Sequence, residues 1–150
     1  MSQIILLDAG PLGLASNPRF SPQTDACNQW ILDRLHNGAQ VLVSEIADFE
    51  VRRELLRANK QPGLARLDTT IKFLGLLPIN RAVMLRAAEL WAQARKLGKP
   101  TASDQSLDAD VIIAAQAALL IDDGDAVTVA THNVSHLARF VPAARWQDIS

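Results

Sequence analysis

Short apolar runs bounded by turn-forming residues recur along the chain and predict its strands. Residues 4–7 (IILL) are entirely apolar, and residues 9–11 (AGP) predict the turn that ends this first strand. Similar runs lie at 40–44 (QVLVS) and 126–131 (AVTVAT), and a weaker one lies at 74–79 (LGLLPI). Runs with so few polar positions are typical of strands covered on both faces, as in a parallel sheet.

Between these runs, apolar residues recur at the spacing of helices that bury one face. Asn80 is a suitable N-cap for the longest helix, and Gly98 and Pro100 follow its end. The last helix is almost entirely apolar after its first turn, so we expect it to be buried on most sides. The predicted helices cover residues 24–37, 46–60, 64–74, 81–97 and 107–120, with loops at 17–22 and 99–106.

The order of these elements predicts the fold class. Strands alternate with helices throughout, which indicates an α/β fold with a mostly parallel central sheet and helices on both of its faces. The chain has 150 residues, of which 49% are hydrophobic, and neither an internal repeat nor a linker interrupts it. We therefore expect a single domain, residues 1–150, with a substantial core.

Composition narrows the setting in which the protein works. Cys27 is the only cysteine, so no internal disulfide is possible and a reducing cytoplasm is expected. No basic leader is present and no apolar run approaches the roughly 20 residues that cross a bilayer, so we expect a soluble protein with no membrane contact. The formal net charge of -1 predicts no attraction of the whole molecule to nucleic acid, so binding of a polyanion would need a local patch or metal ions.

Polar side chains gather at one edge of the predicted sheet. Some of them follow the ends of strands, and others lie in the first turns of helices or just before them. A crossover helix runs back against the sheet, so its first turn lies near the edge where the carboxyl ends of the strands emerge. The residues expected to share this edge are Asp8, Glu45, Glu50, Asp104, Asp108, Asp110, Thr131 and Asn133.

Carboxylates held together in a partly buried crevice repel one another unless protons or cations compensate. Mg²⁺ prefers oxygen ligands, so the pattern predicts metal-assisted phosphoryl chemistry. Structural roles are the alternative for some of these acids, because a helix dipole favours Asp108 and Glu45 in a first turn and Arg53 could pair with Glu50. Asp110 is harder to explain in this way, since it stands at the mouth of the apolar segment VIIAAQAALL.

Four segments resemble, in order, the successive motifs of a PIN domain. They are ILLDAGPLG, VLVSEIADFEVRREL, SLDADVIIAAQA and VTVATHNVSHL, and together they span nearly the whole chain. The PIN family is a small ribonuclease fold that includes the VapC toxins of bacterial toxin–antitoxin pairs. The resemblance implies a three-layer α/β/α sandwich and cleavage of RNA phosphodiesters that depends on Mg²⁺ or Mn²⁺.

The resemblance assigns roles to individual residues. Asp8, Glu50 and Asp110 match the first three acids of the family and would hold the metal ion. Thr131 matches the threonine that follows the last core strand and would orient water or a phosphate oxygen. A metal-bound water would then attack phosphorus in line, without a protein nucleophile.

The chain departs from the family pattern after its last core strand. Asn133 stands where many members have a fourth acid, and it can hydrogen-bond a metal's water but adds no charge. Asp108 or Asp104 could supply a compensating carboxylate. His136 and Leu137 occupy a stretch where many members have an acid followed by phenylalanine, and these departures bear on a second metal more than on the first.

Two classes of function follow from these observations. The first is a metal-dependent ribonuclease, the toxin of a toxin–antitoxin pair, with an RNA substrate, a small antitoxin protein in its groove and a homodimeric assembly. The second is a PIN-like module that binds RNA or a partner with weak or no cleavage, which Asn133 makes plausible. A phospho-acceptor receiver domain fits less well, because the weak strand at 74–79 offers no acceptor aspartate.

A short basic stripe lies next to one of the candidate metal ligands. Arg53, Arg57 and Lys60 recur at helical spacing after Glu50 and could face phosphates. The alternative is a solvated helix face laced with ion pairs such as Asp48 to Arg52. The sequence leaves both interpretations open.

Overall fold

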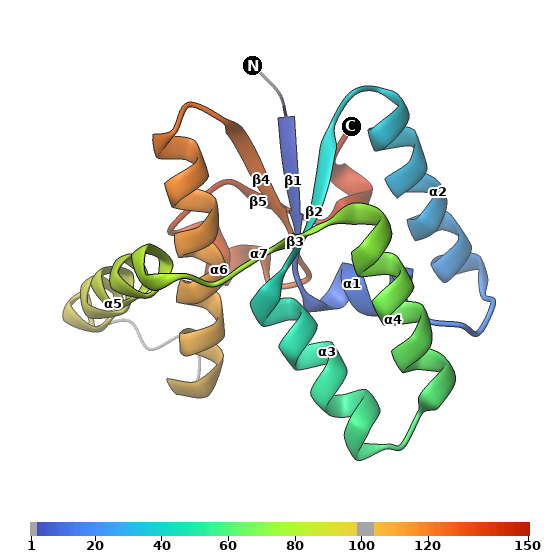
Figure 1. Cartoon of the computed structure of the whole chain (residues 1–150). Coiled ribbons are helices and arrows are strands. Elements are labelled where there is room, and N and C mark those ends of the chain that lie inside the picture. The colour runs from blue at the N-terminus through green and yellow to red at the C-terminus, as the bar shows by residue number, and fades with distance from the viewer. Residues whose placement is uncertain (1–2, 99–103) are drawn as a thin grey trace.

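A computed structural model describes residues 3–98 and 104–150, and its centre is a parallel sheet of five strands (Figure 1). The strand order is β3-β2-β1-β4-β5, and every neighbouring pair is parallel. β1 therefore lies in the middle, where burial on both faces explains its apolar sequence. The strands are β1 (Gln3–Leu7), β2 (Gln40–Ser44), β3 (Leu76–Leu77), β4 (Ala126–Ala130) and β5 (Ala143–Ala144).

Helices connect the strands and cover both faces of the sheet, as predicted (Figure 1). Within the described part of the chain, no helix combines the length and apolar character that a membrane span requires. The helices are α1 (Ala9–Ala15), α2 (Pro22–His36), α3 (Glu45–Arg57), α4 (Gln61–Leu74), α5 (Arg81–Lys96), α6 (Asp104–Asp122), α7 (Val134–Leu137) and the 3₁₀ helix η1 (Trp146–Asp148).

Alternate residues of β1 serve two separate cores. Ile5 and Leu7 pack with residues of α1, α2 and α4 on one face of the sheet. Ile4 and Leu6 pack with residues of α6 and α7 on the other face. α5 packs on the outer side of α6, and its Leu90 also reaches the core on this face of the sheet. The predicted sandwich of helices, sheet and helices is confirmed.

The turn predicted at residues 9–11 is wrong, because a short helix starts there. Asp8 is the N-cap of α1, and its side chain accepts a hydrogen bond from the Ala9 amide. Pro11 lies in the first turn, where an amide has no partner inside the helix and proline is tolerated. Asp8 is an N-cap residue that the apolar run in front of it concealed as a helix-start signal.

Other predicted boundaries change near the ends of elements. The loop expected at 99–106 is wrong for residues 104–106, which belong to α6, whereas 99–103 lie outside the described residues. The strand predicted at 74–79 shrinks to β3, whose two residues pair only with the end of β2. Pro78 has no amide hydrogen to extend that ladder. The short elements α7, β5 and η1 were not predicted.

A buried polar bridge holds α6 against the carboxyl ends of β2 and β3. The Ser44 hydroxyl donates to Gln116 Oε1 over 2.6 Å, and both residues are buried. Gln116 Nε2 donates to the carbonyl oxygens of Leu77 and Pro78, at 2.8 and 3.2 Å. One glutamine therefore satisfies the polar groups of three segments that meet below the acidic edge.

Replacing Gln116 should destabilise the fold strongly. Gln116→Leu keeps much of the side-chain volume but leaves the Ser44 hydroxyl and two carbonyls unpaired, so we expect a loss of about 3 kcal/mol in the free energy of unfolding. Urea unfolding measures this loss. Gln93→Leu, on the exposed side of α5, is the matched control and should change stability by less than about 0.5 kcal/mol. Equal losses in the two variants would contradict the bridge.

Candidate active site

The site lies at the topological switch point of the sheet, where the connections from β1 and to β4 lead to opposite sides. β1 is followed by β2 on one side, whereas β4 returns to the other side of β1. A crevice forms outside the carboxyl ends of the strands at such a switch point and is a common ligand site. Asp8 ends β1 here, and its backbone amide donates to the Ala130 carbonyl at the end of β4.

Hydrogen bonds to both side-chain oxygens hold Asp8 in one orientation. The Ala9 amide donates to Oδ1 and the Thr131 hydroxyl donates to Oδ2, each at 2.8 Å. Thr131 is fully buried and its oxygen also accepts from the Asn133 amide at 2.9 Å. Thr131 therefore positions the Asp8 carboxylate. Its expected contact with water or a phosphate oxygen stays a prediction.

Glu50 faces the same crevice from α3. This helix starts directly after β2, so its second turn stays close to the carboxyl edge of the sheet. Burial and the neighbouring negative charge of Asp8 raise the pKa of Glu50, with a smaller contribution from Asp110. The guanidinium of Arg53, 4.0 Å from Glu50, acts in the opposite direction. The ion pair anticipated from the sequence is thus long, and it does not cancel the increase in the pKa of Glu50.

Asp110 is the most buried acid of the group and has an oxygen without a partner. Burial, followed by the charge of Asp8, raises the pKa of Asp110 to about 6. Among the described residues its Oδ2 atom accepts no hydrogen bond. Nδ1 of His136 on α7 lies 3.7 Å from this oxygen, and the influence of His136 and Arg139 only partly offsets the increase in the pKa of Asp110. A buried carboxylate oxygen without a partner is costly in an apo protein.

The imidazole of His132, just after β4, packs closely against the backbone of Gly10 in α1. A Cβ atom added to Gly10 would lie 2.6 Å from Nδ1 of His132, so only glycine fits this position without displacing the imidazole. His132 follows Thr131, which holds Asp8. This contact was not predicted, and its one signal in the sequence is the glycine three residues after the first strand.

The other residues expected at this edge have no described contact with Asp8, Glu50 or Asp110. Asp108 is exposed and lies two positions before Asp110, so it points to a different side of α6. Glu45 accepts a hydrogen bond from the Ile79 amide at 2.7 Å, which is a structural role. Asn133 is exposed at the start of α7 without a side-chain cap bond. Asp104 begins α6, and its side chain lies outside the described residues.

The chemistry of the three acids fits a divalent cation. Within residues 3–98 and 104–150, no three side chains of His, Cys, Asp or Glu form a ready-made chelate, so binding would require the acids to close up. Asp8, Glu50 and Asp110 nevertheless interact electrostatically with one another, and each offers oxygen ligands. The unpartnered Oδ2 of Asp110 is the atom that a cation would satisfy.

No protein-family model and no curated protein matches the chain in sequence, whereas solved structures match its fold. One is VapBC2 from Rickettsia felis bound to a DNA fragment from its promoter, with a TM-score of 0.71 and 18% identity over 95% of this chain and 98% of that chain.

Two further structures agree. VapBC-1 from nontypeable Haemophilus influenzae gives a TM-score of 0.67, and DNA-bound VapBC from Salmonella typhimurium gives 0.64. Each match has 17% identity and covers 97% of this chain and 99% of the other. Such identities show the fold alone. The chain therefore has the PIN-like fold that its sequence motifs predict, along nearly its entire length.

Proposed function

We propose that the protein is a metal-dependent ribonuclease that hydrolyses RNA phosphodiester bonds. The observation that carries this proposal is the group of Asp8, Glu50 and Asp110, in which one buried carboxylate oxygen has no partner among the described residues. A cation bound there would relieve the repulsion that raises the pKa values of Glu50 and Asp110. The PIN-like fold, with these acids at its carboxyl edge, supports the same conclusion.

The residues of the site divide into ligands and a positioning residue. Asp8, Glu50 and Asp110 would hold Mg²⁺ or Mn²⁺, which in such sites supplies a water of lowered pKa and stabilises charge on the phosphate. Thr131 is the positioning residue: its hydroxyl donates to Oδ2 of Asp8, while the Ala9 amide donates to Oδ1, so the carboxylate is held in one orientation. Asn133 is exposed, and its side chain would hydrogen-bond a metal's water or the substrate at the rim.

The biological setting that we propose is a toxin–antitoxin pair. Three of the solved structures similar to this chain are VapBC structures, and each is matched along almost the full length of the matched chain. A small antitoxin protein is therefore the expected partner, and a homodimer is the expected assembly. An adjacent reading frame that encodes a small protein would support this setting.

A second candidate is a module that binds RNA without cutting it. Two observations favour it: Asn133 adds no charge at the fourth acidic position, and the described residues hold no ready-made chelate of three ligands. The two functions differ in one requirement, because only cleavage needs the metal and the acids together.

Cleavage of RNA should require both the metal and the buried acids. We expect purified wild-type protein to cut a mixed structured RNA with Mg²⁺ or Mn²⁺ and not with EDTA. Asp8→Asn and Asp110→Asn should each lower the rate at least about 100-fold, because each removes a charged ligand. Gel analysis of the RNA measures the rates.

Asp123→Asn is the control for this experiment, since Asp123 is exposed at the far end of α6 and should be replaceable without effect. Circular dichroism checks that every variant is folded. If wild type and both acid variants are equally inactive with either metal, the nuclease proposal is wrong and the binding module takes its place.

The raised pKa of Asp110 should make the metal-free protein less stable as the pH rises. Its pKa is about 6 in the folded state and 3.8 ordinarily, so folding favours the protonated carboxyl. The cost of ionising it is absent below about pH 4 and complete above about pH 7. Asp110→Asn removes this cost, so the variant should be more stable than wild type by about 3 kcal/mol at about pH 7.5, and by about 1 kcal/mol at about pH 4.5.

Urea unfolding in EDTA at the two pH values measures this difference. The change in this stability difference with pH is the informative quantity, since any effect of the amide's own hydrogen bonds is the same at both pH values. A difference between wild type and Asp110→Asn that stays constant across the pH range would contradict the assigned ionisation.

A further inference from the structure

A groove leads away from the acids along α1 and α3. Its volume is about 800 Å³, and we call it the α1–α3 groove. Ala9 and Glu50 line it at the acidic edge, next to Asp8. Arg19, in the loop after α1, and Lys60, between α3 and α4, line it as well. The groove therefore joins the candidate metal site to two cationic side chains from separate loops.

The walls of this groove are largely apolar. Val51 and Leu55 of α3 line it together with Pro18 and Pro62. Gly13 of α1 also lines it, and a Cβ atom added there would meet nothing within 4 Å. The missing side chain of Gly13 thus leaves open space beside α1, in contrast to Gly10, which is crowded by His132.

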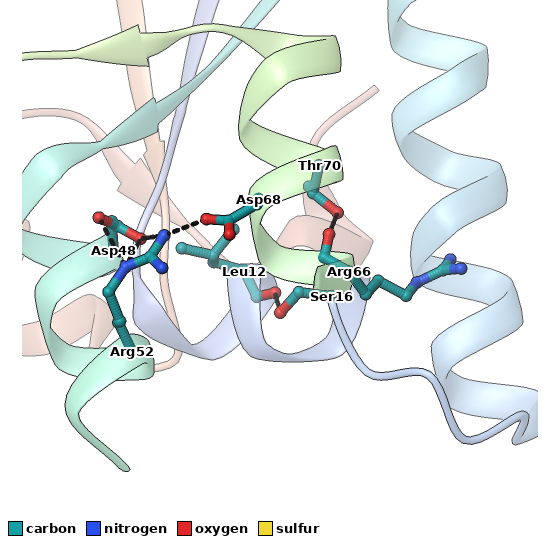
Figure 2. A network of polar contacts seen from close by, with 7 residues as sticks. All are labelled: Leu12, Ser16, Asp48, Arg52, Arg66, Asp68 and Thr70. Carbon is teal, nitrogen blue, oxygen red and sulfur yellow. Dashed lines mark hydrogen bonds and ion pairs between the residues drawn. The ribbon is translucent and has the colours of Figure 1, made fainter. Parts of the chain in front are cut away.

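Polar contacts hold the helices around the groove in place. Figure 2 shows Arg52 of α3 between Asp48 of the same helix and Asp68 of α4, at 2.9 and 2.7 Å. Arg66 of α4 donates to the Ala15 carbonyl at the end of α1. These contacts link α3 to α4 and α4 to α1, so the groove is formed before any ligand arrives, which lowers the entropic cost of binding.

The cations of the groove differ in whether they are already neutralised. Arg57 donates to Glu54 at 2.9 Å, which matches the solvated, ion-paired interpretation of the basic stripe. The side chains of Arg19 and Lys60, in contrast, have no ion-pair partner among residues 3–98 and 104–150. Two unpaired cations beside an apolar wall suit a ligand that carries both anionic and flat apolar groups.

We propose that the α1–α3 groove binds a single-stranded segment of the RNA next to the cleaved phosphate, an inference that rests on the proposed nuclease function. Arg19 and Lys60 would contact backbone phosphates, and a base would lie against the apolar wall beside Gly13. From Glu50 to the end of α3 at Arg57 is about 10 Å along the helix, a reach of roughly two or three nucleotides.

The apolar wall of the groove favours one strand over two, because only unpaired bases can lay their faces against it. Paired bases are hidden inside a duplex, whereas unpaired bases can be laid on a protein surface.

Binding of a short unstructured RNA in EDTA tests the groove separately from cleavage. Fluorescence anisotropy of a labelled oligonucleotide gives the affinity at several salt concentrations. Arg19→Ala with Lys60→Ala should weaken binding about tenfold and reduce the slope of log K against log salt by about 1.4, the value for two phosphate contacts on a single strand. Gly13→Leu should weaken binding about tenfold with no change in slope, because it fills apolar space.

Lys72→Ala, an exposed cation of α4 outside the groove, is the matched control and should bind as wild type does. A duplex of the same sequence should bind more weakly than the single strand. If the groove variants bind RNA as wild type does while wild type still cleaves it, the groove inference is wrong and the nuclease proposal stands. If wild type neither binds nor cleaves RNA, the proposed function itself fails.

Discussion

Three carboxyl groups that must share one partly buried crevice are the constraint on which the site depends. Each comes from a different element, and their mutual repulsion and burial raise the pKa values of Glu50 and Asp110. Burial of apolar side chains in the two cores on either side of β1 offsets this unfavourable free energy. Carboxylates therefore repel one another at the carboxyl edge of the sheet, and a bound cation is the simplest means of offsetting this repulsion.

One short segment connects the sheet, the acids and the groove. Asp8 ends the central strand, caps α1 and is held by Thr131 from β4. α1 then continues as one wall of the α1–α3 groove, with Gly13 leaving space where a side chain would intrude. The eight residues from Asp8 to Ala15 thus include a candidate metal ligand and also shape the surface on which a substrate strand would lie, so the proposed binding and chemistry share one local structure.

The sequence was sufficient to predict four of the five strands, most helices and the proximity of Asp8, Glu50 and Asp110. These features depend on apolar periodicity and on the rule that strand ends share an edge. The sequence was insufficient where a side chain has two possible partners. Glu45 bonds Ile79 and Thr131 bonds Asp8, and such choices depend on packing that a linear pattern does not contain. The helix at Ala9 was missed because its cap is also the end of a strand.

Calorimetric titration of the metal-free protein with Mn²⁺ tests the central claim, that the crowded acids form a cation site, most directly. At about pH 6 Asp110 is half protonated, so binding should release about half a proton, seen as a heat that varies with the ionisation enthalpy of the buffer. This proton release should vanish at about pH 8 and in Asp110→Asn, which should also bind more weakly. Absence of binding, or binding that Asp110→Asn leaves unchanged, would contradict the account.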